Sequence, residues 1–124
     1  MTDRLAILIW AATPEQPALV VTPLVHALAA RALDAEVELH FAGPAVRWLV
    51  DGVADAAWPT PAGDKSVGDF LREVIAAEGC LYACGMARAA WLGEGEILLP
   101  AVAAAGATAF VARTLDPAWQ TLVY

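Results

Sequence analysis

The chain has 124 residues and a net charge of −7, with 17% charged and 60% hydrophobic residues. This length predicts one domain covering residues 1–124. The negative charge disfavours nucleic acids and anionic membrane surfaces as partners, because both repel an acidic protein. The apolar excess comes partly from 29 alanines, but together with five tryptophans it indicates a homo-oligomer.

The apolar stretches of the chain are short. The run 5–10 near the N-terminus is too short for the apolar part of a secretory signal. The longest uncharged stretch, 97–112, falls short of the roughly 20 residues that span a bilayer. We therefore expect a cytoplasmic protein without a membrane partner, in which the two cysteines are reduced thiols.

The first elements alternate between strand and helix patterns. The continuous apolar run 5–10 predicts a strand buried on both faces. A helix is expected within 17–33, beginning either at Pro23 or near Pro17 with a kink at Pro23. Residues 37–41 alternate apolar and polar side chains, which predicts a strand at a sheet edge with one face exposed to water.

The middle of the chain contains its clearest helix signal. A short helix is expected over 45–50, followed by a loop over 53–65. Ser66 and Asp69 have the spacing of a capping pair, so a helix begins after Ser66. Gly79 is expected to end that helix as its C′ residue.

The last third of the chain is predicted as strand 80–84, helix 86–92, helix 97–105, strand 107–112 and a short strand 121–124. Strands that alternate with helices in this way indicate an α/β fold with a mostly parallel sheet covered on both faces. Ligands of such folds gather at the carboxyl ends of the strands.

Cys84 is the main candidate for chemistry, because it lies at the carboxyl end of a predicted buried strand. Gly85 follows it and leaves room for a second molecule, and a helix begins within two residues. Backbone N–H groups at a helix start favour the thiolate, which is the nucleophilic form of cysteine. The alternative is a buried, inert cysteine that acts as a small hydrophobic residue.

The other chemical side chains give weaker signals. Cys80 and Cys84 are about 13 Å apart if 80–84 is a strand, which is too far for a disulfide, so Cys80 is expected to fill the core. His26 and His40 have no metal or catalytic spacing, and structural or solvated roles are expected for both. The first strand–helix turn lacks the glycines of a phosphate loop, and we expect neither a cofactor nor a metal.

Four residues are candidates for binding a substrate beside Cys84. Trp10 ends the first strand and Trp91 lies in the helix after Cys84, so both are placed to line a cavity near the thiol. Ordinary core or subunit contacts are the alternative for the two tryptophans. Gly85 and Met86 complete the set, since they follow the cysteine directly.

Four stretches of the sequence resemble the DsrE/DsrF-like family. They are Leu8–Ala12, Val37–Phe41, Leu81–Ala87 and Ala109–Arg113, and the Tyr-Ala-Cys-x-Met pattern within the third is the most specific. The resemblance covers nearly the whole chain and is greater to single-chain members than to the subunits of sulfur-relay complexes. It implies a three-layer α/β/α fold with a five-stranded parallel sheet, assembled as trimers or hexamers.

Some members of that family carry sulfur as a cysteine persulfide and pass it to a partner protein, and Cys84 falls at the candidate sulfur-accepting position. The resemblance therefore implies a sulfur-transfer protein with donor and acceptor protein partners. The alternative is a non-enzymatic homo-oligomeric module that binds a small ligand or partner protein, with Cys84 inert.

Overall fold

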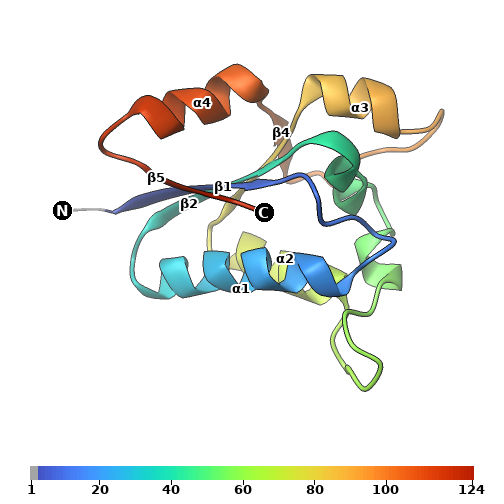
Figure 1. The fold of residues 1–124 in the computed structure, drawn as a ribbon. Coiled ribbons are helices and arrows are strands. Elements are labelled where there is room, and N and C mark those ends of the chain that lie inside the picture. The colour runs from blue at the N-terminus through green and yellow to red at the C-terminus, as the bar shows by residue number, and fades with distance from the viewer. Residues whose placement is uncertain (1–2) are drawn as a thin grey trace.

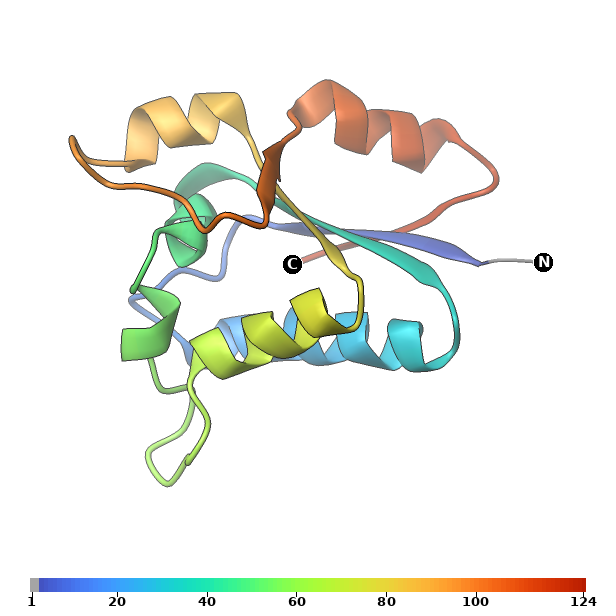
Figure 2. The same ribbon diagram turned by 180° about the vertical axis from the view of Figure 1, so that it is seen from behind.

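The structure, a computed structural model, describes residues 3–124. Five strands form one sheet in the order β4-β3-β2-β1-β5, and every neighbouring pair is parallel. Helices cover both faces, with α1 and α2 on one side and α3 and α4 on the other (Figures 1 and 2). This is the three-layer α/β/α fold that the sequence predicts. The strands are β1 (Arg4–Ile9), β2 (Glu36–Phe41), β3 (Cys80–Ala83), β4 (Val102–Ala104) and β5 (Gln120–Val123).

The helices between these strands are α1 (Ala18–Ala32), α2 (Val67–Ala76), α3 (Gly85–Trp91) and α4 (Ala107–Leu115), with 3₁₀ helices η1 (Gly43–Leu49) and η2 (Ala54–Ala56). The expected short helix at 45–50 is thus η1, and the expected loop at 53–65 contains η2. Of the two predicted starts for the first helix, the one near Pro17 is correct, because Pro17 is the N-cap and Pro23 lies inside α1.

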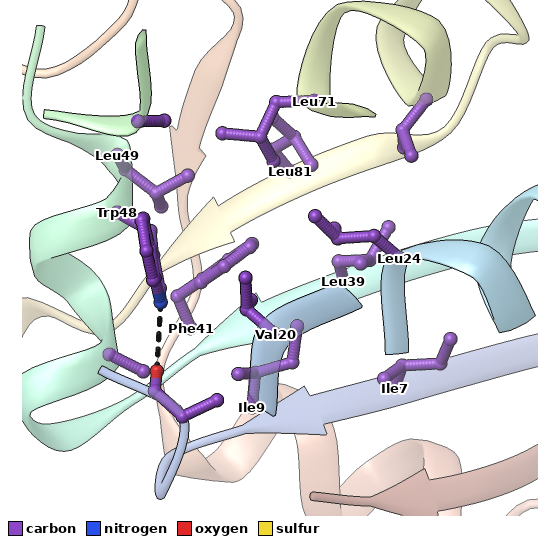
Figure 3. Packing of buried hydrophobic residues seen from close by; sticks show 14 of the residues in the cluster. Ile7, Ile9, Val20, Leu24, Leu39, Phe41, Trp48, Leu49, Leu71 and Leu81 are labelled. Carbon is purple, nitrogen blue, oxygen red and sulfur yellow. Dashed lines mark hydrogen bonds between the residues drawn. The ribbon is translucent and has the colours of Figure 1, made fainter. Parts of the chain in front are cut away.

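The main core lies between the sheet and the α1/α2 layer. Ile7, Ile9, Leu39 and Phe41 from the strands are fully or almost fully buried there, together with Leu24 of α1 (Figure 3). Parallel strands in the interior of a sheet carry such continuous apolar side chains because helices cover them. The burial of β1 is therefore as the sequence predicts.

Trp48 of η1 closes this core at the carboxyl ends of the strands. Its indole is completely buried, and Nε1–H donates a 2.9 Å hydrogen bond to the carbonyl of Ala12 (Figure 3). A buried indole N–H needs such a partner. The bond ties the segment after β1 to η1.

The prediction that residues 37–41 form an edge strand is wrong. β2 is the central strand, paired with β1 and β3, and five of its six residues are buried. Its polar side chains Glu38 and His40 lie on the α3/α4 side but are 8% and 4% exposed. The alternation of apolar and polar side chains along β2 therefore reflects two buried faces, one apolar and one polar. It does not reflect a solvent-exposed face.

Two predictions near the C-terminus are also wrong. Residues 97–105, expected as a helix, are extended and include β4, which pairs with β3 through Val102 and Leu81. Residues 107–112, expected as a strand, belong to α4, where Phe110 is the buried residue. Alanine has the highest helix propensity of all residues, which favours α4, whereas Pro100 lies within the segment 97–105 and disfavours a helix there. The last predicted strand is confirmed as β5.

The end of α2 differs from the prediction by one residue. Ser66 and Asp69 form the expected capping box at its start. At its end, Glu78 takes the left-handed conformation (φ 69°), and Gly79 N–H bonds to the carbonyl of Val74. This is a Schellman motif in which the glycine is C″ instead of C′. Gly79 is required for space, since a Cβ there lies 2.6 Å from Val74 Cγ1.

We predict that Gly79→Ala lowers the free energy of unfolding by roughly 1–3 kcal/mol, because the added methyl group overpacks against Val74. Denaturant unfolding measures it. Gly85→Ala is the matched control, since a Cβ at Gly85 meets no atom within 4 Å. An equal effect of the two substitutions contradicts the prediction.

Candidate functional site

Cys84 directly follows β3 and is the N-cap residue of α3. Its backbone N–H donates a 3.1 Å hydrogen bond to the carbonyl of Phe41, which ties the end of β3 to the end of β2. Its carbonyl accepts from Arg88 and begins the helix. The expected strand–thiol–helix arrangement is present, and the side chain of Cys84 is partly buried.

Cys84 lines a cavity of about 180 Å³ on the α4 side of the sheet. The walls are mostly apolar, and the only polar side chain among them besides the thiol is the imidazole of His40. The principal lining residues are Leu8, His40, Cys84, Ala105, Phe110 and Val111. The carboxyl ends of β1, β2, β3 and β4 therefore meet helix α4 at this cavity, which is where parallel sheets place their sites.

His40 belongs to a buried polar cluster on the central strand. Its Nε2 lies 3.0 Å from Glu38 Oε1, and its ring stacks on Tyr82 with 5.0 Å between ring centroids. Phe110 of α4 meets the same ring edge-on at 5.4 Å. The sequence predicted a structural or solvated role for His40. It did not predict that His40 lies in the wall of the same cavity as Cys84.

Arg113 of α4 neutralises the buried carboxylate of this cluster. Its Nε and Nη2 donate to the two oxygens of Glu38 at 3.1 and 2.9 Å, and its guanidinium lies 4.1 Å from the ring centroid of Trp119. Burial by itself raises the pKa of the Glu38 carboxyl, but the hydrogen bonds from Arg113 and His40 outweigh burial and lower that pKa. Glu38 is therefore an ionised acceptor.

The other predicted substrate-binding residues do not line the Cys84 cavity. Trp10 is 54% exposed at the end of β1, and Met86 is 84% exposed in the first turn of α3. Trp91 ends α3, where its carbonyl accepts from Arg47. Gly85 borders a different, shallow groove along α3. Gly85 does leave the expected room for a second molecule, since a Cβ built at this position meets no atom within 4 Å.

Cys80 is also placed differently from the prediction. It is exposed, instead of filling the core, and borders a cleft of charged side chains that includes Arg4 and Glu78. Both cysteines are free thiols, at opposite ends of β3. Within residues 3–124, no three histidine, cysteine or acidic side chains gather as a metal site requires.

Comparison with known proteins agrees with this arrangement. The sequence model of the DsrE/DsrF-like family matches residues 6–124, so the chain belongs to that family, whose members are associated with sulfur relay. The crystal structure of the ychN protein from E. coli has the same fold, with a TM-score of 0.76 and 15% identity over all of both chains. A search of curated protein sequences found no match. No helix among residues 3–124 has the length and apolar character to cross a membrane.

We predict that Glu38 stabilises the fold in a pH-dependent way. Its pKa in the folded protein is lowered from 4.5, so its contribution is present above that value and is lost as the pH falls through the folded pKa. The difference in unfolding free energy between the native protein and Glu38→Gln should therefore shrink from about pH 6 to about pH 3. Urea unfolding across that range measures it, and a constant difference contradicts the prediction.

Proposed function

We propose that the protein carries sulfur as a persulfide on Cys84. The observation that supports this most is the position of the thiol, which is partly buried at the end of β3 and borders a small cavity. The family to which the chain belongs is associated with sulfur relay. No organic cofactor or metal is required for this chemistry.

The reaction is an exchange between sulfur atoms. The Cys84 thiolate attacks the outer sulfur of a donor persulfide, R–S–SH, and the S–S bond of the donor breaks. The donor leaves as R–SH, and Cys84 holds the outer sulfur as Cys–S–SH. Attack by an acceptor thiolate on that outer sulfur reverses these roles and returns Cys84 to the thiol. No net oxidation takes place, so no further reactant is needed.

A partly buried thiol suits a carrier because a persulfide is consumed by any thiol that reaches it. The apolar walls around Cys84, including Phe110 and Val111, limit access on the α4 side. The open space at Gly85 leaves a direction from which a donor or acceptor protein approaches. We propose that these partners are proteins and that the chain acts in the cytoplasm.

We expect Cys84 to gain about 32 Da, one sulfur atom, when the protein is incubated with glutathione persulfide. Intact-protein and peptide mass spectrometry measure the gain. Cys84→Ser should abolish it, while Cys80→Ser, the matched control at the other end of β3, should retain it. Equal sulfur uptake by Cys84→Ser and the native protein rules out the proposal.

The second candidate is a module that binds a small apolar ligand, with Cys84 inert. The apolar walls of the 180 Å³ cavity favour it, because such a cavity accepts an apolar group without polar partners. In that case Cys84 should react with iodoacetamide as slowly as a thiol that is buried in the core of a folded protein. An apolar ligand that fills the cavity should slow the reaction further.

We also propose that the protein is a homo-oligomer, a trimer or a hexamer. Large apolar side chains remain exposed on several elements, such as Trp10 after β1, Leu115 on α4 and Val123 on β5. Exposed apolar side chains that lie together in one patch are typical of subunit interfaces. Light scattering coupled to size-exclusion chromatography should give three or six times the mass of one chain, and a monomer at micromolar concentration contradicts the proposal.

A further inference from the structure

Strand β5 leaves one edge of the sheet open. It is the last strand in the order β4-β3-β2-β1-β5, so among residues 3–124 only β1 pairs with it. Tyr124, which follows β5, donates its N–H to the carbonyl of Leu8 and accepts from the N–H of Trp10, so its backbone faces β1. Successive residues of a strand point their backbone groups to opposite sides. The N–H and C=O groups of Thr121 and Val123 therefore point away from β1.

This edge carries none of the features that keep edge strands from pairing. Natural edges are protected by charged side chains, by proline or by short strands, because their free backbone groups otherwise pair with another chain. Residues 120–124 contain no charged side chain and no proline. The opposite edge strand, β4, is only three residues long and follows shortly after Pro100. β5 is therefore the unprotected edge of the sheet.

The side chains of β5 are apolar and exposed on both faces of the sheet. Paired residues of a parallel sheet lie on the same face. Leu122 pairs with Ile7 and lies on the α1 face, whereas Val123 pairs with Leu8 and lies on the α4 face. Leu122 is 41% and Val123 58% exposed. A strand that covers this edge removes apolar surface from water on both sides.

Helix α4 extends the apolar surface beside β5. It packs on β1 and β5 (Figure 1), and Thr114 Oγ1 lies 3.5 Å from Thr121 Oγ1. Its buried residue is Phe110. At about 100° per residue from Phe110, Thr114 comes first on the β5 side, and Val111 and Leu115 follow. These two are 50% and 78% exposed, so an uncovered apolar stripe runs along α4 next to the open edge.

We propose that a second copy of the chain pairs with β5 in antiparallel orientation, across a two-fold axis at Leu122. Leu122 then lies opposite Leu122 of the second copy, and Thr121 of each copy lies opposite Val123 of the other. Opposed residues of this kind exchange both of their backbone hydrogen bonds. The outward N–H and C=O groups of β5 are thereby paired, and the two sheets join into one.

Self-complementarity and charge favour a second copy over a different protein. In this register the residues that point outward face each other, and Leu122 meets its own copy. Two copies with a net charge of −7 each repel unless their contact surfaces carry little charge. α4 and β5 have one charged side chain, Arg113, and Glu38 already pairs with it. The face therefore suits contact between like-charged chains.

The spacing and size of the contact also fit. α4 lies over β1 and β5, and strands are about 4.8 Å apart, so the two α4 helices lie about 10 Å apart across the axis. Packed helices have this distance, which lets the stripes of Val111 and Leu115 meet. A standard interface takes about 800 Å² from each partner, about an eighth of the 6797 Å² surface of the chain. α4 has nine residues and β5 four, and ten of these are exposed, so this face is of the required order.

This inference rests on the proposed homo-oligomer and names one of its interfaces. It does not depend on the sulfur chemistry of Cys84. A hexamer with closed symmetry built from trimers contains two-fold axes, and a trimer does not. We therefore expect six chains instead of three.

Val123→Pro tests the backbone pairing. It removes one outward N–H from each copy and leaves the bonds to β1, and edge strands tolerate proline at such a position. Light scattering coupled to size-exclusion chromatography should give six chains for the native protein and three for Val123→Pro. Val123→Thr, which keeps the N–H and the branched shape, is the matched control and should keep six. Three chains in the native protein overturn the inference, as does an unchanged mass in Val123→Pro.

A disulfide trap tests the register without removing a backbone bond. In the Cys80→Ser Cys84→Ser background, Leu122→Cys places two thiols in a non-hydrogen-bonded pair with Cα atoms about 4.5 Å apart, which suits a disulfide. Copper phenanthroline in air should convert this variant into a covalent dimer on a non-reducing gel. Val123→Cys in the same background is the control and should stay a single chain, since its Cα atoms lie more than about 8 Å apart. Absence of the Leu122→Cys dimer overturns the inference even if Val123→Pro fails to fold.

This inference and the proposed sulfur transfer fail separately. If Cys84 gains sulfur from glutathione persulfide but Leu122→Cys forms no dimer, sulfur transfer stands and the β5 contact is overturned. If Leu122→Cys forms the dimer but Cys84 gains no sulfur, the β5 contact stands and sulfur transfer fails. A native protein of two chains that Val123→Pro splits into single chains supports the β5 contact and overturns the proposed trimer or hexamer.

Discussion

The arrangement of this protein depends on a charged pair buried on its central strand. Glu38 of β2 lies in the middle of a sheet that helices cover on both faces, and a carboxylate there is costly unless it is paired. Arg113 provides the pair with two hydrogen bonds from α4. α4 packs against β1 and β5, and this contact joins it to the central strand on the face where α4 also lines the cavity beside Cys84.

The two faces of the sheet have different tasks. The α1/α2 face carries the large apolar cluster built on Ile7, Leu39 and Phe41, which supplies most of the burial. The α4 face has a much smaller apolar cluster of Ala6, Phe110 and Trp119. Polar side chains and short residues such as Ala105 occupy the rest of it, so it retains a cavity. Stability is concentrated on one face, and the candidate chemistry on the other.

The candidate site was only partly accessible to sequence reasoning. Cys84 could be selected because an apolar run, a glycine and a helix pattern follow one another locally. His40 could not, because strict alternation in a strand has the same appearance at a wet edge as at a buried polar layer. Trp10 follows a strand at the same edge of the sheet as Cys84, and Met86 is two residues from Cys84 in the sequence, but neither lines the cavity. A position at that edge, or one close in sequence, does not specify where a side chain points.

The sequence by itself determined the alternation of strands and helices as far as α3, the parallel sheet, the capping box at Ser66 and the place of Cys84 at a strand end. These features depend on local spacing and on backbone propensities, which neighbouring residues carry. Only the tertiary structure decided that β2 is central, that the alanine-rich segment 107–112 is helical, and that Arg113 meets Glu38. Such features depend on contacts between residues far apart in the chain, where burial and charge pairing outweigh local preference.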